Sequence, residues 1–201
     1  MGKLFGTDGI RGIVGENLTA DLAFRVGQAV GTVLMEEKGG QRPTVVLGKD
    51  TRISSDLLEA ALIAGLCSVG SDVKPVGDIP TPAVAYLTRQ EKADAGIVVS
   101  ASHNPYEHNG IKVFNSQGYK LSDALEERVE EKILSKEPMA LKTRGELGRR
   151  HHGMKQLKRD YIDFVASTID SDLAGLRILV DCANGAASAT APELFGRFKA
   201  H

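Results

Sequence analysis

Hydrophobic and polar positions along the chain alternate between a helical and an extended period. Residues 19–38 repeat apolar positions at intervals of three and four behind a capping threonine, which predicts a helix that ends at the glycine pair after it. Residues 44–48, TVVLG, are a short β-branched run bounded by proline and glycine, which predicts a buried strand. By the same criteria we expect helices at residues 54–70 and from Thr81, and strands at residues 72–75 and 95–99.

This alternation of strands and helices predicts a three-layer α/β/α domain with a mostly parallel sheet that helices cover on both faces. The pattern changes after residue 110, so we expect the sheet to be mixed. Residues 111–122, IKVFNSQGYKLS, predict a small hairpin that turns at Asn115 to Gly118, and residues 122–134 predict a charged helix. The EERVEEK run at residues 126–132 is typical of an exposed helix face with opposed charges.

The second part of the chain predicts a new domain. Residues 135–153 are polar, irregular and rich in Lys, Arg and Gly, which is typical of a linker. Residues 154–170 then predict an amphipathic helix, and residues 176–188, LRILVDCANGAAS, predict a strand that enters a glycine-containing turn. One strand and two helices cannot enclose their own apolar faces. We therefore predict one domain over residues 1–153 and the beginning of a second, incomplete domain over residues 154–201.

Composition narrows the classes of partner. The 201 residues are 42% hydrophobic and 25% charged, as in a globular protein with its own core, and the net charge of −1 gives no broad basic field for nucleic acid or an anionic membrane. Apolar runs such as residues 60–66 are far shorter than the roughly 20 residues of a membrane-spanning helix. Cys67 and Cys182 show no CxxC spacing and no secretory leader precedes them, which favours the reducing cytoplasm.

Candidate chemistry gathers where predicted strands end. In an open parallel sheet, ligands bind beyond the carboxyl ends of the strands. The segment KDTRISS follows the first strand and supplies Lys49, Asp50 and Arg52, whereas SASHNP follows the strand at residues 95–99 and FGTDGIRG lies near the N-terminus. Each segment combines small residues with cations or hydroxyls, a combination that suits the approach of an anion to the backbone.

Ser102, in SASHNP, has two interpretations on residue types alone. It is a nucleophile or phosphoryl carrier at a strand end, or the segment merely turns the chain and caps a helix, as Ser and Asn commonly do. A serine hydrolase is disfavoured, because the chain has no GxSxG elbow and no His–Asp pair at a meaningful spacing.

The segment VVSASHNPYEHNGIK, residues 98–112, resembles the active-site serine signature of the α-D-phosphohexomutase superfamily. FGTDGIRG and LTADLAFRVGQAVG resemble its bacterial phosphoglucosamine mutase branch, and the likeness extends over essentially the whole chain through GKDTRISS, DIPTPAVAYL and VDCANGAAS. SHNP alone would be weak, but several blocks in the right order are specific.

The resemblance implies conversion of glucosamine 6-phosphate to glucosamine 1-phosphate through a phosphoserine enzyme and glucosamine 1,6-bisphosphate, feeding UDP-N-acetylglucosamine and cell-wall synthesis. It implies Mg²⁺ bound by the phosphate on Ser102 and by a DxDxR loop of the second domain, a loop that this sequence lacks. We therefore expect an N-terminal fragment that is inactive alone. The alternatives are a phosphomannomutase or phosphoglucomutase, or a non-catalytic truncated homologue that acts as an interaction module. The resemblance allows a homodimer, and the sequence leaves the oligomeric state open.

Phosphoryl transfer depends mainly on alignment and charge neutralisation, which predicts cations around Ser102. By resemblance Lys112 matches the acid–base lysine and Arg11 the N-terminal active-site arginine, against their alternatives as a solvated strand lysine and a surface arginine. Arg52 either stabilises the serine loop or simply pairs with Asp50. His103 also matches the family, and it either hydrogen-bonds the phosphate or has only a structural role. Asn104 matches a residue that braces the loop, and Thr7, Asp8 and Gly9 match residues that line the cleft. Asp8 would repel a phosphate unless a cation or hydroxyl lies between them.

Overall fold

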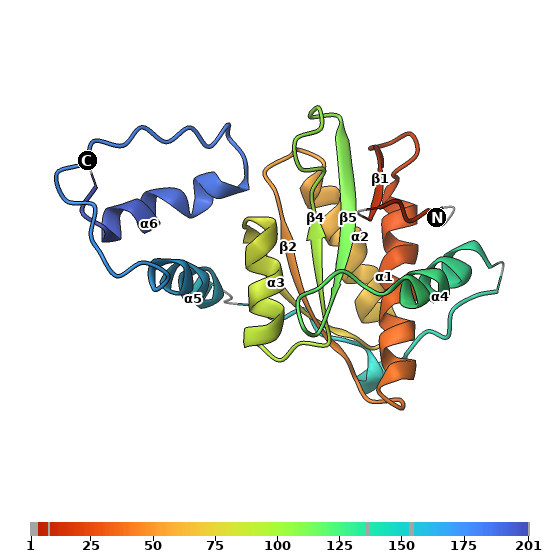
Figure 1. The fold of residues 1–201 in the computed structure, drawn as a ribbon. Helices are drawn as coiled ribbons and strands as arrows, with labels where there is room; N and C mark the ends of the chain where they lie inside the picture. The colour runs from red at the N-terminus through yellow and green to blue at the C-terminus, as the bar shows by residue number, and fades with distance from the viewer. Residues whose placement is uncertain (1–3, 8, 136, 153–154, 201) are drawn as a thin grey trace.

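The computed structural model describes residues 4–7, 9–135, 137–152 and 155–200 (Figure 1). At its centre lies one mixed sheet of five strands: β1 (Ile10–Ile13), β2 (Thr44–Lys49), β3 (Asp72–Asp78), β4 (Ala95–Val99) and β5 (His108–Asn115). Their spatial order is β1-β5-β4-β2-β3. β2 pairs in parallel with β3 and β4, whereas β5 runs antiparallel to both β4 and β1.

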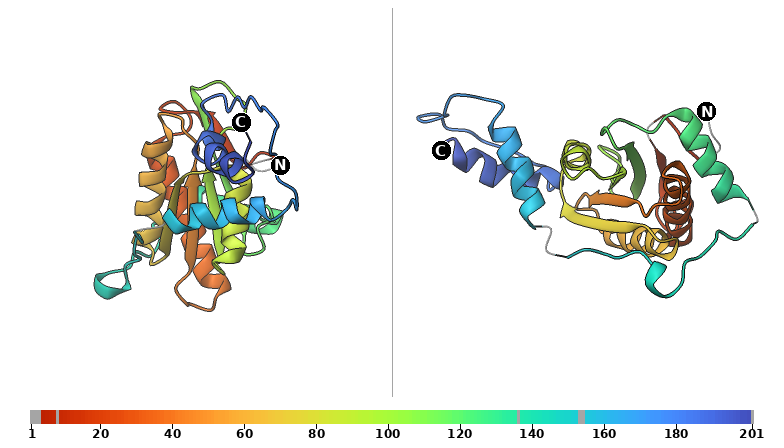
Figure 2. Two further views of the ribbon diagram at one scale, coloured as in Figure 1. Left: turned by 90° about the vertical axis from the view of Figure 1, so that its left-hand side faces the viewer. Right: turned by 90° about the horizontal axis from the view of Figure 1, so that it is seen from below.

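Helices cover both faces of this sheet, so the expected three-layer α/β/α class is confirmed. Seen from below in Figure 2, α1 (Ala20–Glu37) and α2 (Ser55–Ser68) lie on one side of the sheet and α3 (Thr81–Gln90) on the other. α4 (Asp123–Leu134) packs beside α1. The later elements are the 3₁₀ turn η1 (Arg144–Glu146), α5 (Lys155–Ala166), the 3₁₀ turn η2 (Ala186–Ala189) and α6 (Ala191–Arg197).

Alternation along the strands divides the apolar side chains between two cores. Val45 and Leu47 of β2 pack towards α1 and α2, whereas Val46 packs towards α3, because successive strand residues point to opposite faces. α1 and α2 approach closely at Gly65, where a Cβ atom would overlap the carbonyl oxygen of Phe24. This two-sided burial fixes the sheet and therefore the loops at its carboxyl ends.

The predicted hairpin at residues 111–122 is only partly correct. The chain does turn after Asn115, whose N–H donates to the Tyr119 carbonyl at 2.8 Å, but the returning segment makes a single bridge, Phe114 to Lys120, and no strand. β5 instead begins at His108 and pairs along its length with β4 and β1. β1 was not predicted, because the glycines around it break the hydrophobic alternation.

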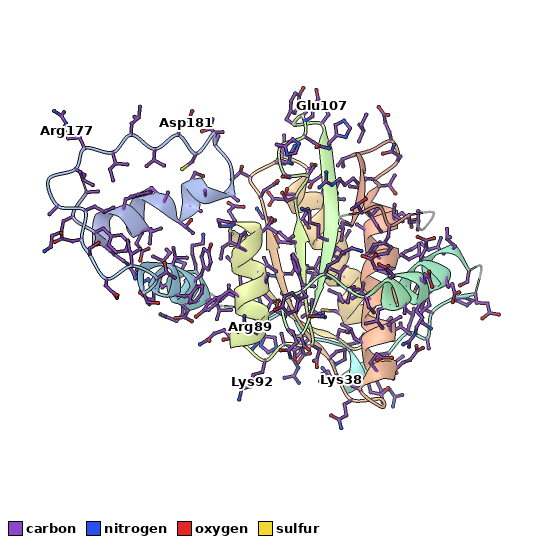
Figure 3. The ribbon with its side chains drawn as sticks, viewed as in Figure 1. Lys38, Arg89, Lys92, Glu107, Arg177 and Asp181 are labelled. Atoms are coloured by element: carbon purple, nitrogen blue, oxygen red, sulfur yellow. The ribbon has the colours of Figure 1, made fainter. Side chains whose placement is uncertain are left out.

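The predicted strand after residue 176 is wrong for the described chain. Residues 176–182 are irregular, and Leu179 is 99% exposed. Figure 3 labels Arg177 and Asp181 on this irregular segment, away from the central sheet. A strand needs a neighbouring strand for its backbone hydrogen bonds, and none of the described strands lies beside this segment. The boundary between the two domains therefore stays a prediction.

The α4 charges are not simply an exposed face, contrary to the expectation for EERVEEK. Glu126 and Glu130 are buried. The Glu130 carboxylate accepts the N–H groups of Leu4 and Phe5 at 2.8 and 3.1 Å, and Glu126 accepts from Lys120 at 2.7 Å. Periodicity missed this because the partners are distant in sequence. α4 thus anchors the N-terminal segment that leads to the site.

The predicted linker is partly ordered along the edge of the sheet. Val73 of β3 donates its N–H to the Arg149 carbonyl and accepts from the His151 N–H, both at 2.8 Å. This segment covers the hydrogen-bonding edge that β3 would otherwise expose. None of the helices among the described residues combines the length and apolar character needed to span a bilayer.

Candidate active site

The loop between β4 and β5 places Ser102 at the carboxyl end of β4. In Figure 3 Glu107, in this loop, marks that end of the domain, and Arg89 and Lys92 mark the opposite end. Ser102 is exposed and has φ +58°, a left-handed conformation that is strained for a residue other than glycine. Its N–H donates to the Ser100 hydroxyl at 3.1 Å, and its Oγ lies 3.4 Å from Nδ1 of His103. The hydroxyl is therefore accessible on a constrained backbone.

Arg52 holds this loop from beneath. Its Nε donates to Asp50 at 3.0 Å, and its two terminal nitrogens donate to four loop carbonyls. The side chain is only 11% exposed. Arg52 thus both pairs with Asp50 and braces the loop, so the two alternatives left by the sequence occur together. The four acceptors are the carbonyls of Ser102 (3.0 Å), Asn104 (2.9 Å), Pro105 (2.7 Å) and His108 (3.0 Å).

Behind Arg52 lies a buried polar network that the sequence did not reveal. Asp50 accepts from the Ser55 hydroxyl at 2.8 Å, and the Asn109 amide donates to the hydroxyls of Ser54 and Ser55, both at 3.0 Å. Asn109 is fully buried. An Asn-Gly pair usually signals a turn, so nothing in the local sequence marked Asn109 as a residue inside a strand.

The register of the sheet brings Arg11 and Lys112 to one face. Arg11 lies opposite Gly110 across the β1–β5 pair, and Lys112 is two residues further along β5, opposite Val98 of β4. Residues two apart on a strand share a face, and diagonal neighbours are about 7–8 Å apart. The Ser100 N–H donates to the Gly110 carbonyl at 2.9 Å, so Ser100 belongs to the same row as Arg11. Antiparallel pairing with β4 places Lys112 opposite Val98, four residues before Ser102 along the chain.

The N-terminal segment forms a hollow beside Arg11. Gly9 is buried with φ +88°, and a Cβ atom there would overlap the carbonyl oxygen of Ile111, so this position requires glycine. Asp8 lies outside the described residues. The hollow has a volume of about 320 Å³ and is lined by Leu4, Gly6, Thr7, Gly9 and Arg11.

Asn104 joins the loop through its backbone. Its N–H donates to the Ala101 carbonyl at 3.1 Å, and its own carbonyl accepts from Arg52. His103 is exposed beside the Ser102 hydroxyl. Ser102, His103 and Asn104 thus lie together in the loop after β4, with Arg11 on β1 and Lys112 within β5.

Lys49, the last residue of β2, is held by two carboxylates. Its Nζ lies 3.0 Å from Asp56 and 2.5 Å from Asp78. Burial opposes its charge, but hydrogen bonds to the two carboxylates outweigh burial and raise the pKa of Lys49. Lys49 is thus already paired with two carboxylates, which the local sequence pattern did not indicate.

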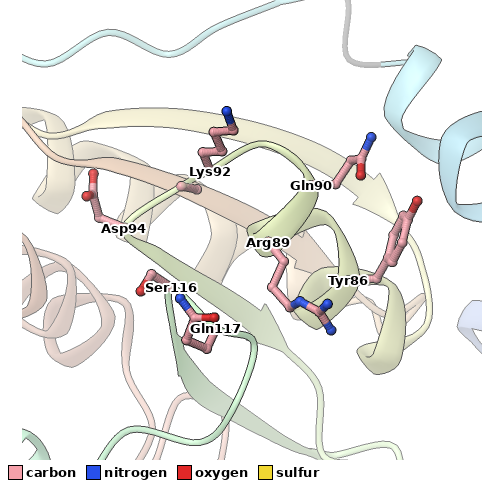
Figure 4. Close-up of a pocket in the computed structure, with 8 residues that line it drawn as sticks. Tyr86, Arg89, Gln90, Lys92, Asp94, Ser116 and Gln117 are labelled. Atoms are coloured by element: carbon pink, nitrogen blue, oxygen red, sulfur yellow. The ribbon is translucent and has the colours of Figure 1, made fainter.

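A second hollow, of about 500 Å³, lies at the amino ends of β2 and β4 (Figure 4). Its carboxylate, Asp94, already accepts from Lys38 and from the Thr44 N–H, both at 2.8 Å. Ligands of open α/β sheets bind at the carboxyl ends instead. This hollow is therefore not the candidate site. Its lining residues are Tyr86, Arg89, Gln90, Lys92, Ala93, Asp94, Ser116 and Gln117.

A known protein family matches the part of the chain that holds the candidate site. The family described as "Phosphoglucomutase/phosphomannomutase, alpha/beta/alpha domain I" matches residues 2–139, which is more than half of the chain. The chain belongs to the phosphoglucomutase/phosphomannomutase family. The serine loop, Arg11 and Lys112 all lie inside the matched region of this family.

Similar proteins support this membership over nearly the whole chain. The phosphoglucosamine mutase of Caldanaerobacter subterraneus is 59% identical over 195 residues, and that of Acetivibrio thermocellus is 56% identical over 196. Both alignments cover 97% of this chain but 43% of the relative. A solved phosphoglucomutase/phosphomannomutase family protein from Burkholderia thailandensis superimposes with a TM-score of 0.80 at 27% identity, covering 98% of this chain and 42% of that one. The chain thus spans less than half the length of these relatives.

Proposed function

We propose that this chain forms the phosphoserine-bearing domain of a phosphoglucosamine mutase, which interconverts glucosamine 6-phosphate and glucosamine 1-phosphate. One observation carries the proposal: Ser102 is exposed on a constrained backbone at the carboxyl end of β4, and the sheet register puts Arg11 and Lys112 on one face of the neighbouring strands β1 and β5. The product would feed synthesis of UDP-N-acetylglucosamine and the cell wall in the cytoplasm. The cysteines, Cys67 and Cys182, are unpaired, which suits a reducing compartment.

The proposed reaction consists of two phosphoryl transfers. First, the C1 hydroxyl of glucosamine 6-phosphate attacks the phosphorus on Ser102; an oxygen–phosphorus bond to C1 forms, the bond to Oγ breaks, the sugar hydroxyl loses its proton and Oγ gains one. The product is glucosamine 1,6-bisphosphate. After the bisphosphate has turned round, Oγ attacks the 6-phosphate, the bond to O6 breaks, and the protons move in the opposite sense. Ser102 is phosphorylated again and glucosamine 1-phosphate leaves.

The roles that we propose for the surrounding residues come from the family resemblance, and their positions support them. Lys112 carries the proton between the sugar hydroxyl and Oγ, and Arg11 orients the phosphoryl group from the hollow that Thr7 and Gly9 also line. His103 donates a hydrogen bond to a phosphoryl oxygen, because its ring already lies against Oγ. Arg52 donates to five acceptors within the protein, so it acts on the loop.

Mg²⁺ would neutralise part of the phosphoserine charge of about −1.5 to −2. Among the described residues, no group of three or more His, Cys, Asp or Glu side chains is arranged to hold a metal ion. These residues therefore do not form a cage for Mg²⁺, and the phosphate on Ser102 would be the ligand that this part of the chain supplies.

The choice of sugar rests on the relatives. The two relatives described above, at 59% and 56% identity, are named phosphoglucosamine mutases, whereas the solved family protein at 27% identity carries a broader name. A phosphomannomutase or phosphoglucomutase remains the alternative enzyme, and a non-catalytic interaction module the alternative of another class. We propose that the 201-residue chain alone is inactive, because it spans only 43% of its relatives.

The test uses the full-length protein. Phosphopeptide mass spectrometry should find phosphate on Ser102 and not on Ser100. Turnover on glucosamine 6-phosphate should exceed turnover on mannose and glucose 6-phosphates. Preference for another sugar would reassign the substrate, and absence of both phosphate and turnover would favour the interaction module. Normal turnover by the isolated chain would refute its proposed inactivity.

A further inference from the structure

The serine loop turns several of its carbonyl groups inward towards Arg52. A guanidinium has five N–H donors in a fixed planar fork. Here Nε donates to Asp50, and the terminal nitrogens donate to four carbonyls, among them those of Ser102 and Pro105. Each of the five N–H donors of the Arg52 guanidinium thus has an acceptor within the protein.

The direction of a carbonyl fixes the direction of the next amide. In a trans peptide the C=O of one residue and the N–H of the following residue point to opposite sides, and the described residues contain no cis peptide. The N–H of His103 follows the Ser102 carbonyl, and the N–H of Tyr106 follows that of Pro105. Both N–H groups therefore point away from Arg52.

Four N–H groups of the loop, those of Ala101, His103, Tyr106 and Glu107, have no acceptor among the described residues, and of these only His103 and Tyr106 follow a carbonyl that Arg52 binds. Ser102, Asn104 and His108 donate their N–H groups to Ser100, Ala101 and Pro105, respectively. Within the described part of the chain, the His103 and Tyr106 N–H groups have no protein acceptor, and both residues are exposed. Outward amide N–H groups in a tight turn attract anions such as phosphate.

We propose that Arg52 is a positioning residue for phosphoryl transfer: it holds the carbonyls of Ser102 and Pro105 inward, so that the N–H groups of His103 and Tyr106 face the phosphoryl group on Ser102. Arg52 itself does not contact that phosphoryl group. It also holds Ser102 in its left-handed conformation, which the loop alone would relax. This inference rests on the proposed function.

Replacing Arg52 with lysine separates geometry from charge. Lysine keeps the positive charge but has three donors on one flexible ammonium, so it cannot hold four carbonyls and Asp50 together. If charge alone mattered, R52K would be nearly neutral. Because loop position matters here, we expect kcat of the full-length R52K enzyme to fall about 10- to 100-fold with little change in KM.

The matched control is Arg42→Lys. Arg42 also pairs with an aspartate, Asp72, and donates to two carbonyls, those of Gly145 and Leu147, but at the β3 edge. R42K should leave kcat unchanged. Phosphorus NMR of the phosphorylated full-length proteins gives a local readout, because N–H donors favour the dianion: the phosphoserine pKa should rise in R52K and stay at the wild-type value in R42K.

A second measurement needs no variant and therefore does not depend on the folding of R52K. In the wild-type full-length protein, the amide proton resonances of His103 and Tyr106 should move downfield when Ser102 is phosphorylated and return after phosphatase treatment. Unmoved resonances, or an R52K enzyme with wild-type kcat and phosphoserine pKa, would overturn the inference alone. A wild-type protein without phosphate on Ser102 and without turnover would overturn the proposed function as well.

Discussion

Two irregular segments of this protein are held by the same device and do different things. Arg52 pairs with Asp50 and holds the serine loop through four carbonyls, whereas Arg42 pairs with Asp72 and holds residues 145–147 through two. The Arg52 side chain is 11% exposed and the Arg42 side chain 34%.

The difference lies in what each segment presents. The loop above Arg52 carries an exposed hydroxyl on a strained residue, next to a face that bears Arg11 and Lys112. The segment above Arg42 runs along β3 and covers its edge. An arginine that hydrogen-bonds several carbonyls therefore fixes the conformation of a loop. Whether that loop has a function depends on the side chain that it presents.

The largest expected effect comes from removing that side chain. Ser102→Ala in the full-length protein should abolish covalent phosphate and lower mutase turnover by at least about 10³-fold, because the phosphoryl carrier is lost. Mass spectrometry and a coupled assay measure the two effects. Circular dichroism should be unchanged, since the hydroxyl is exposed. Phosphate retained on the variant would identify Ser100 as the carrier instead.

The Arg42–Asp72 pair at the β3 edge should affect the stability of the fold rather than turnover. Asp72→Asn removes a carboxylate that accepts from Arg42 at 3.0 Å and from the Arg149 N–H at 2.8 Å. Hydrogen bonds to a charged group contribute about 1.5 to 3 kcal/mol, so the free energy of unfolding should fall by that amount in urea titrations at pH 7.

The pH dependence of this loss has a definite sign. Burial pushes the pKa of Asp72 up, but hydrogen bonds from Arg149, Arg42 and His151 outweigh it, so the pKa lies below its usual 3.8. The stabilisation is thus present above about pH 3.8 and is lost as the pH falls through the folded-state pKa. Wild type and D72N should converge below that window. An unchanged free energy of unfolding at pH 7 would show that the Arg42 contacts contribute nothing.

The smallest effect is expected at Glu59, a carboxylate that no arginine of the described residues hydrogen-bonds. Burial raises the pKa of Glu59 above 4.5, and its Oε1 is buried without a hydrogen-bond partner among the described residues. The charged form is therefore unfavourable in the fold, and stability is lost as the pH rises from 4.5 through the folded-state pKa. Glu59→Gln should stabilise the chain at pH 7 by less than about 1 kcal/mol, because solvent screens the half-buried group. Thermal melts at pH 4 and 7 test this: the gain should appear only at pH 7.

Local patterns predicted the elements that depend on nearby residues. Thr19 caps α1, accepting from the Leu22 N–H, and β4 spans the predicted residues 95–99. Failures occurred where partners are remote in sequence. β1 was missed, the hairpin became a strand between two others, residues 176–182 formed no strand, and the buried Glu130 accepts from residues far along the chain.

The sequence by itself determined the α/β/α class and the polar loop after β4, because periodicity and turn chemistry act over a few residues. The candidate serine came from the resemblance of residues 98–112 to a family signature. Only the tertiary structure decided that Arg11 and Lys112 share a face, that Lys49 is neutralised by Asp56 and Asp78, and that Arg52 holds the loop. These facts depend on strand register and on contacts beyond the reach of local patterns, which span 29 residues between Lys49 and Asp78 and 50 between Arg52 and Ser102. Such contacts form only when strands from different parts of the chain have paired in the sheet.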